Sequence, residues 1–224
     1  MRIALIGFGK MGREIDSLAR EQGETITCVF DSHHPVQAKE LADVDVCIDF
    51  STPASVLSNI HAAIAAQKDI VVGTTGWNEH LEDIGSKAVN SGVLHSPNFS
   101  LGMNIFMRLA ARAAELMQNA KQYDPFIHEI HHREKIDSPS GTALRLADRL
   151  LQKMERIEPG TLPISSTRAG FVTGTHTIGF DSESDLIELR HVAKNRRGFA
   201  FGALTAARWL RGRKGIYTMD DVEL

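Results

Sequence analysis

The first hundred residues alternate short apolar runs with segments of helical spacing. Apolar runs of strand length occupy residues 2–6, 25–30, 44–50, 69–72 and 92–95, and helical spacing is found at 11–21, 53–67 and 79–90. Continuous apolar strands separated by helices predict a parallel sheet that is covered on both faces. We therefore expect an α/β domain at the start of the chain.

The pattern changes near Ser100. Helices are predicted at 102–118, 142–154 and 201–211, and strands at 126–131, 164–168, 174–180 and 186–193. No helical segment separates the last three strands, which favours a mixed or antiparallel sheet. The chain is thus predicted to have an α/β domain followed by an α+β domain, with the boundary near Ser100.

A glycine-rich turn follows the first predicted strand. It reads Gly7-Phe8-Gly9-Lys10-Met11-Gly12 and opens a helix, and Asp31 ends the second strand nineteen residues after Gly12. The glycines allow a pyrophosphate to approach the helix N-terminus, and the carboxylate accepts hydrogen bonds from ribose hydroxyls. This pattern predicts a Rossmann-type dinucleotide site. Asp31 repels a 2′-phosphate whereas Lys10 attracts one, so we expect NADH or NADPH to bind, with NADH slightly preferred.

Three further loops follow predicted strands at the sheet edge where α/β proteins bind ligands. They are Gly73-Thr74-Thr75-Gly76, Ser96-Pro97-Asn98-Phe99 and, as the weakest candidate, Phe50-Ser51-Thr52. Their backbone groups and hydroxyls suit contact with a nicotinamide. Ordinary turn chemistry explains each loop about equally well when it is taken alone.

The segment 128–143 concentrates proton donors and cationic side chains, and its sequence is H-E-I-H-H-R-E-K-I-D-S-P-S-G-T-A. Its first five residues spell H-E-x-x-H, the zinc-protease signature, which needs a helix so that two histidines share one face. Phe126, Ile127 and Ile130 favour a strand instead. Strand residues four apart are separated by roughly 13 Å, too far to share one zinc ion. We therefore predict no metal site.

The end of the same segment predicts a carboxylate site. Ser140 precedes an Ala/Leu-rich helix and suits its N-cap position. The N–H groups of Gly141 and Thr142 would then point outward at the positive end of the helix, where an anion is stabilised.

Side chains just upstream complete this candidate site. His132 and Lys135 offer further donors to the same anion. His131 can donate a proton, because imidazole changes charge near neutral pH. For any one histidine alone a structural role is the commoner explanation, but the combination favours a site.

Composition and charge limit the expected binding partners and the expected cellular location of the protein. The 224 residues carry a formal net charge of −3 at pH 7, which gives no reason to expect nucleic acid as the main partner. No apolar stretch approaches ~18 residues, so no membrane span is expected. The apolar run from Ile3 stops at Gly7, which argues against a signal peptide, and Cys28 and Cys47 resemble buried apolar residues. We expect a soluble, cytoplasmic protein.

Together these motifs resemble the 4-hydroxy-tetrahydrodipicolinate reductase (dihydrodipicolinate reductase) family. The resemblance is carried, in order along nearly the whole chain, by the glycine turn, residues 49–51, 73–76, 97–100, Gly102, Asn104, 129–143, 168–170 and 174–176. It implies NADH- or NADPH-dependent reduction of a cyclic dicarboxylate to tetrahydrodipicolinate, with loss of water, in diaminopimelate and lysine biosynthesis. It also implies a dinucleotide-binding domain of residues 1–100 and 208–224, and a substrate-binding domain of residues 101–207 that forms a homotetramer.

The resemblance also implies roles for single residues. His131 would be the proton donor and Lys135 a second one, and His132, Gly141 and Thr142 would hold the substrate carboxylates, with Thr75 close to both ligands. The cofactor contacts would be Gly7, Phe8, Gly9, Lys10, Met11, Gly12, Asp31, Phe50, Gly73, Thr74, Thr75, Ser96, Pro97, Asn98 and Phe99. Ser32 stands where many members carry arginine, which leaves the choice between NADH and NADPH open.

Two other functions remain as alternatives. A two-domain amino-acid dehydrogenase would explain the glycine turn, but it would not explain the paired histidines with Lys135 and the Ser-Gly-Thr turn. A redox-sensing, NAD(P)-binding regulator would keep the fold but would not need the proton donors.

Overall fold

The chain folds into two compact units in a computed structural model that describes residues 1–223. The first unit comprises Met1–Leu101 and the segment from Arg196 onward, and the second is Gly102–Asn195. The chain thus returns to the first unit at Arg196 rather than at Arg208, the position that the family resemblance implies. The reason is that helix α6 (Arg197–Leu210) buries an Ala/Leu-rich face in the core of the first unit.

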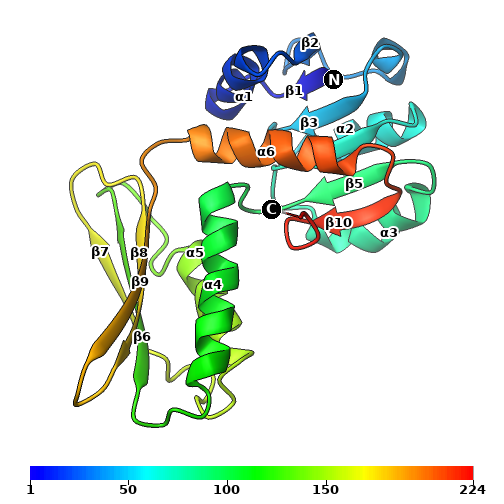
Figure 1. Cartoon of the computed structure of the whole chain (residues 1–224). Helices are drawn as coiled ribbons and strands as arrows, with labels where there is room; N and C mark the ends of the chain where they lie inside the picture. Colours follow the sequence, from blue (N-terminus) through cyan, green and yellow to red (C-terminus); the bar gives the residue numbers. More distant parts are fainter. Residues whose placement is uncertain (224) are drawn as a thin grey trace. The chain divides into compact units, whose positions relative to one another are not determined.

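The first unit is built on a six-stranded parallel sheet with the order β10-β5-β4-β3-β1-β2 (Figure 1). The strands are β1 (Arg2–Ile6), β2 (Thr25–Phe30), β3 (Val46–Asp49), β4 (Asp69–Val72), β5 (Gly92–His95) and β10 (Gly215–Thr218). The predicted parallel sheet is confirmed. Strand β10 is not predicted by the sequence, because its four residues include only two large apolar side chains.

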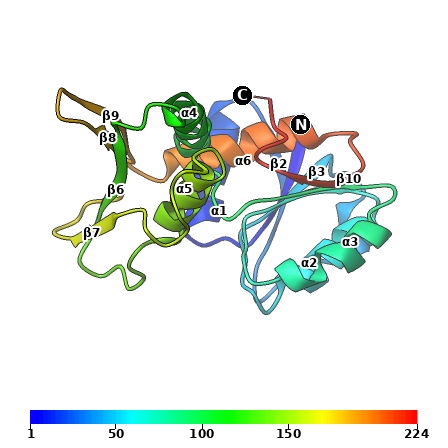
Figure 2. The same ribbon diagram turned by 90° about the horizontal axis from the view of Figure 1, so that it is seen from below.

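Helices cover both faces of this sheet, as Figures 1 and 2 show. Helices α1 (Lys10–Glu21) and α6 cover one face, and α2 (Val56–Ala65) and α3 (Leu81–Lys87) cover the other. Successive strand residues point to opposite faces, so Leu5 packs toward α1 and α6 while Ile6 packs toward α2. Two short 3-10 helices, η1 (Ala38–Leu41) and η2 (Asn78–His80), complete the unit.

The second unit contains a four-stranded mixed sheet with the order β7-β6-β8-β9. The strands are β6 (Asp124–His131), β7 (Ile164–Arg168), β8 (Thr175–Asp181) and β9 (Leu186–Val192). Helices α4 (Leu101–Met117) and α5 (Gly141–Leu151) lie on one face of the sheet (Figure 1), over a core that includes Phe106, Leu146, Ile178 and Phe180. The predicted mixed sheet is confirmed.

The pairing of β7 determines which side chains meet in this unit. Strand β7 does not continue into a hairpin with β8 but pairs in parallel with β6, whereas β6–β8 and β8–β9 are antiparallel. The segment β6–α5–β7 is therefore a parallel crossover. Its register places Arg168, at the end of β7, opposite His131, at the end of β6.

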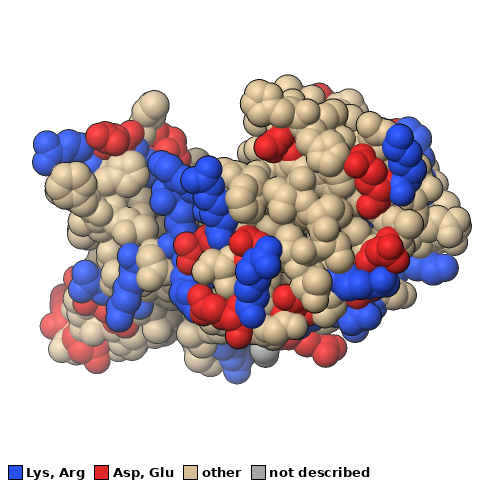
Figure 3. Space-filling view, turned by 90° about the horizontal axis from the view of Figure 1, so that it is seen from above, with Lys and Arg blue, Asp and Glu red and all other residues tan. Residues whose placement is uncertain are grey.

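Charged groups of opposite sign lie beside one another on the face drawn in Figure 3. Within the first unit, α6 is tied to the start of the chain by ion pairs of Arg197 with Glu21 and of Arg208 with Glu24. An exposed pair such as Arg197–Glu21 typically contributes ~1 kcal/mol or less, so the apolar face of α6 provides most of its attachment. Within residues 1–223, no helix combines the length and the apolar character that crossing a membrane requires.

The close contact between α6 and the loop after β5 can be tested by substitution. A Cβ at Gly202 would lie 1.7 Å from the carbonyl oxygen of Phe99, so Gly202→Ala should lower the free energy of unfolding by about 1–3 kcal/mol in denaturant titrations. Gly198 is the matched control in the same helix, since the nearest atom to its Cβ would be Ser100 Oγ at 3.8 Å. Gly198→Ala should be neutral or stabilising by up to about 1 kcal/mol. Equal losses in both variants would contradict the close contact between Gly202 and Phe99.

Candidate active site

The first unit has a cavity at the carboxyl edge of its sheet, where the strand order reverses. Strand β2 lies on one side of β1 and β3 on the other, so the connections after β1 and β3 leave toward opposite faces of the sheet and open a crevice. The cavity in this crevice has a volume of about 670 Å³. Five predicted cofactor contacts line it, namely Gly7, Phe8, Gly9, Asp31 and Phe50.

The glycine turn approaches the neighbouring loop so closely that side chains are excluded. Gly7 has φ +90°, and a Cβ there would lie 2.3 Å from the carbonyl oxygen of Phe50. A Cβ at Gly12 would lie 2.1 Å from the carbonyl oxygen of Gly7. Helix α1 begins after Gly9 without a side-chain cap, so its first N–H groups are left for an anion, as a dinucleotide pyrophosphate site requires.

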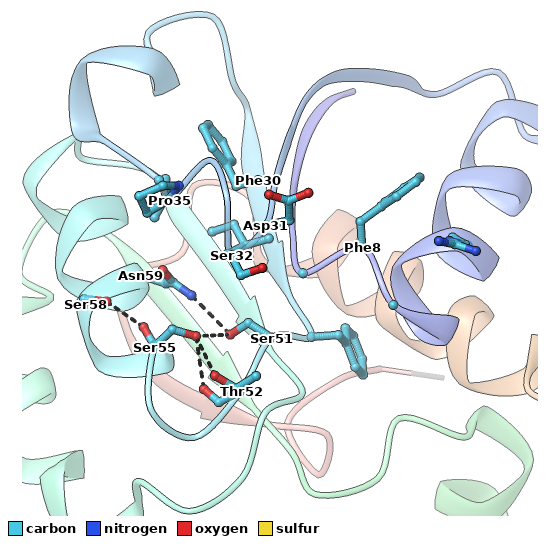
Figure 4. Close-up of a pocket in the computed structure, with 16 residues that line it drawn as sticks. Phe8, Phe30, Asp31, Ser32, Pro35, Ser51, Thr52, Ser55, Ser58 and Asn59 are labelled. Carbon is cyan, nitrogen blue, oxygen red and sulfur yellow. Dashed lines mark hydrogen bonds between the residues drawn. The ribbon is translucent and has the colours of Figure 1, made fainter.

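Asp31 lies at the end of β2 in a fixed orientation. Its Oδ1 accepts hydrogen bonds from the backbone N–H groups of His33 (2.8 Å) and His34 (3.0 Å), and these bonds lower the pKa of the carboxyl group. In Figure 4 the Asp31 and Ser32 side chains lie between the turn that carries Phe8 and the side chains of Ser51 and Asn59. A charged carboxylate at this position suits ribose hydroxyls.

Arg13 is a cavity residue that the sequence reasoning missed. It lies in the first turn of α1, lines the cavity, and has its guanidinium 5.9 Å from the centre of the Phe8 ring. Its position three residues after Lys10 on the same helix is the signal that would have identified it.

A buried carboxylate, Asp49, joins two of the predicted loops. Its oxygens accept hydrogen bonds from Thr74 Oγ1 (2.6 Å), from Asn59 Nδ2 (2.8 Å) and from both the N–H and the hydroxyl of Ser51. Burial raises the pKa of Asp49, although these hydrogen bonds oppose the effect. The loops after β3 and β4 are therefore held together by one fully buried group.

The remaining loop candidates differ in what they expose. Thr75 and Pro97 are exposed, whereas Phe99 is buried against Phe50, with their ring centres 5.7 Å apart. The Ser96 hydroxyl donates to the carbonyl oxygen of Asn98 within its own loop (3.0 Å). A cofactor contact at Phe99 would therefore involve the backbone rather than the ring.

The role of the Asp49 network can be tested with two neighbouring threonines. Thr74→Val removes the hydrogen bond to Asp49 and the acceptor for the Ser51 N–H, so we expect the free energy of unfolding to fall by about 1–3 kcal/mol. NADH binding should weaken as well, because the loop after β3 loses its anchor. Thr75→Val is the isosteric control at an exposed position, where stability should stay within about 0.5 kcal/mol. Similar stability losses in both variants would show that Asp49 does not organise the loops.

In the second unit, strand β6 separates the residues of the H-E-x-x-H segment. Burial alternates along β6, so Glu129 and His131 lie on the face that packs against the helices. His128 lies on the opposite face with Nε2 3.1 Å from Thr167 Oγ1, and His132 follows the end of the strand. The predicted strand is confirmed, and the spacing that a zinc protease needs is absent from this segment.

The predicted cap of α5 is also confirmed. The Ser140 hydroxyl oxygen accepts a hydrogen bond from the Ala143 N–H at 3.2 Å. The Gly141 N–H donates to Asp137 Oδ2 at 3.3 Å, and Lys135 Nζ lies 2.6 Å from Asp137 Oδ1. The hydrogen bond from Lys135 is the main reason why the pKa of Asp137 is lowered. Two of the predicted carboxylate donors thus already hold a carboxylate of the chain.

Behind this turn lies a buried polar cluster centred on Glu129. Its Oε1 accepts hydrogen bonds from the Ser140 N–H (2.9 Å), the Ser166 hydroxyl (2.7 Å) and Arg168 Nη2 (2.8 Å). Its Oε2 lies 3.2 Å from His131 Nδ1. Burial opposes the charged form, but the donors outweigh it and lower the pKa of Glu129 to about 2.

His176 on β8 completes the cluster. Its Nε2 lies 3.6 Å from Glu129 Oε2, and its ring centre is 5.1 Å from that of His131. Burial lowers the pKa of His131, against the opposing charge of Glu129, and lowers the pKa of His176 to about 4. Glu129, His131 and His176 are residue types that bind metals, and their ligating atoms lie within 4.8 Å of one another. However, the carboxylate already has the Arg168 guanidinium as its counter-charge, which describes an ion-pair network rather than a metal centre.

The sequence analysis assigns no role to Glu129, Arg168 or His176, and only for Glu129 does the sequence carry a usable signal. Glu129 and His131 are two apart on a predicted strand, which places them on one face. The positions of Arg168 and His176 depend on strand pairing, which the sequence does not specify.

Acid titration should reveal the buried histidine. An unfolded imidazole titrates near 6.5 and His176 at about 4, so the unfolded chain binds this proton first and stability falls as the pH drops from about 6.5 to 4. The expected loss from this group is on the order of 3 kcal/mol. His176→Gln should remove this part of the pH dependence in denaturant titrations, whereas His128→Gln, on the outer face of the sheet, should keep it. Identical pH dependence of the wild type and His176→Gln would contradict the assignment.

Two family models together match nearly the whole chain. They are dihydrodipicolinate reductase, N-terminus, over residues 1–99, and dihydrodipicolinate reductase, C-terminus, over residues 102–222. The chain is 38% identical to the 4-hydroxy-tetrahydrodipicolinate reductase of Christiangramia forsetii, covering 99% of this chain and 97% of the relative. It is 36% identical to the protein of the same name from Archaeoglobus fulgidus, covering 99% of both.

A solved structure agrees with these matches. Dipicolinate-bound dihydrodipicolinate reductase from Paenisporosarcina sp. TG-14 superposes with a TM-score of 0.84 at 25% identity, over 97% of both chains. Fold and sequence therefore point to the same group of proteins.

Proposed function

The chain belongs to the dihydrodipicolinate reductase family, and on this premise we propose which of its residues carry out the reaction. It is an oxidoreductase that uses NADH or NADPH to reduce 4-hydroxy-tetrahydrodipicolinate to tetrahydrodipicolinate, a step of diaminopimelate and lysine biosynthesis. One hydride and one proton are added to the substrate and one water is lost.

The main support for the substrate site is the set of hydrogen bonds that the Asp137 carboxylate accepts. It accepts hydrogen bonds from Lys135 Nζ and the Gly141 N–H, so these two donors converge on a carboxylate-sized position at the N-terminus of α5. We assign this position to a substrate carboxylate, which exchanges with Asp137 when it binds. Thr142 and His132, on either side of the same turn, supply the remaining donors.

His131 is assigned as the proton donor. It ends β6 beside the loop that carries Lys135, and Glu129 faces its Nδ1. The other ring nitrogen, Nε2, then delivers the proton to the substrate carbon. Lys135 stabilises the negative charge that develops during reduction.

The first unit fits a dinucleotide. The turn from Gly7 to Gly12 excludes side chains, the start of α1 has N–H groups without a cap, and Asp31 faces the same cavity. When it is bound, the dihydronicotinamide supplies the hydride. We assign Lys10 and Met11 to the same turn contacts, residues 73–75 and 96–99 to nicotinamide contacts, and Thr75 to contact with both ligands, as the family resemblance implies.

Assembly and location are further proposals. The family resemblance implies a homotetramer, and Leu186 and Val192, which are about half exposed on the face of the sheet that α4 and α5 leave uncovered, support association through this face. The cytoplasmic location remains a prediction from the sequence.

The reaction is tested by following the absorbance of NADH and NADPH side by side. Freshly generated 4-hydroxy-tetrahydrodipicolinate should cause oxidation of both nucleotides, and omission of the substrate should abolish it. His131→Gln and Lys135→Met should lower kcat by about 10²-fold or more, because these groups act in the transition state. His132→Leu should mainly raise the KM of the dicarboxylate, because it removes a side-chain donor to the substrate carboxylate. Unchanged turnover of His131→Gln would refute its assignment, and reduction of amino-acid-derived substrates alone would favour the dehydrogenase alternative.

A further inference from the structure

The side of His131 that faces the protein interior meets one charged atom at short distance. Its Nδ1 is buried and makes no aligned hydrogen bond within the described chain, and Glu129 Oε2, which is likewise buried without an aligned partner, lies 3.2 Å away. A small rotation of the ring would align the two atoms. Glu129 is itself immobile, because Ser140, Ser166 and Arg168 all hold its other oxygen.

The opposite edge of the ring is kept clear. Nε2 lies beside Gly174, where a Cβ would be only 3.1 Å from it. A residue with a side chain at this position would crowd the nitrogen that the proposed function assigns to proton delivery.

We infer that Glu129 is the positioning residue of His131. Its carboxylate keeps a proton on Nδ1, so that Nε2 is the nitrogen that gains and loses the catalytic proton, and its fixed negative charge favours the imidazolium form. The inference rests on the proposed role of His131 as the proton donor. In the step itself the Nε2–H bond breaks, a C–H bond forms on the substrate, and the ring becomes neutral with its remaining proton directed at Glu129.

The negative charge of Glu129 is needed to stabilise the imidazolium form because the His131 ring is buried. Burial lowers the pKa of His131, and the negative charge of Glu129 is the main influence that opposes this. A carboxylate that holds the Nδ1–H of a catalytic histidine both fixes the tautomer and stabilises the imidazolium, a principle known from other enzymes. Here the carboxylate remains charged at neutral pH because its own pKa is about 2.

Several other titratable groups surround His131 and affect its charge. Arg168 on β7 and Lys135 in the loop after β6 disfavour the imidazolium, whereas Asp137 in the same loop as Lys135 favours it. His176 on β8 is neutral at pH 7 because its pKa is about 4, and His191 on β9 has a pKa lowered by burial. Glu129 is therefore the one buried negative charge among them.

The test is the pH profile of kcat for the wild type and Glu129→Gln with saturating NADH and dicarboxylate. Activity of a general acid falls as the pH rises through its pKa, so Glu129→Gln should move this basic limb to lower pH by at least about one unit. At pH 8 kcat should fall tenfold or more, while the KM values of both substrates change little. A purely structural role would instead lower kcat by the same factor at every pH.

Two further variants make the outcome decisive. Arg168→Gln removes the positive charge that neutralises Glu129, so its basic limb should move to higher pH, opposite to that of Glu129→Gln. Glu134→Gln removes a carboxylate from an exposed position in the same segment and should leave the limb in place. If Glu129→Gln fails to fold, as checked by thermal unfolding and NADH binding, the Arg168→Gln shift alone decides. Unshifted limbs in both variants would overturn the inference.

These results are distinguishable from a failure of the proposed function. If His131→Gln retains wild-type turnover, the proton-donor assignment itself is wrong. If His131→Gln is inactive but neither Glu129→Gln nor Arg168→Gln shifts the limb, the assignment of His131 holds and only the role of Glu129 is refuted.

Discussion

A carboxylate that is buried in a folded domain requires hydrogen-bond donors or a counter-charge, and each unit of this chain is organised around one such group. In the first unit Asp49 joins the loops that follow β3 and β4. In the second unit Glu129 joins β6, β7 and the start of α5. Both carboxylates are fully buried. Hydrogen bonds and ion pairs to these buried carboxylates, and not apolar packing alone, therefore hold the elements that present the proposed ligand contacts.

The two carboxylates differ in their partners, and their pKa values move in opposite directions as a result. Asp49 is surrounded by hydroxyl, amide and backbone N–H donors without a cation, so burial prevails and its pKa is raised. Glu129 is also inaccessible to solvent, but its donors, which include Arg168, outweigh burial and lower its pKa to about 2. A raised pKa suits a group that only has to hold loops together. A fixed negative charge suits a group that faces a titrating histidine.

The distance along the chain between interacting residues explains which parts of the structure could be predicted from the sequence. Strand and helix positions, the parallel sheet, the glycine turn and the Ser140 cap follow from periodicity and local chemistry, which act over a few residues. Strand β10 was missed because its short sequence becomes a strand only by pairing with β5. The role of Glu129 could not be predicted, because it depends on Ser166, Arg168 and His176, which lie 37 to 47 residues further along the chain. Contacts of this kind are set by strand order and register, which local patterns do not determine.

The position of Asp137 indicates how the proposed substrate site avoids an unpaired ammonium group at the N-terminus of α5. Lys135 and the Gly141 N–H would otherwise face water at a point where positive charge accumulates from both the side chain and the helix dipole. Asp137 satisfies both donors locally, and its own pKa is lowered in return. A substrate carboxylate offers the same charge and the same acceptor geometry, so exchange leaves the electrostatics of the turn nearly unchanged. The gain on binding must then come from the rest of the ligand, which favours a dicarboxylate over a simple carboxylate because only the former brings a second charged group to the site.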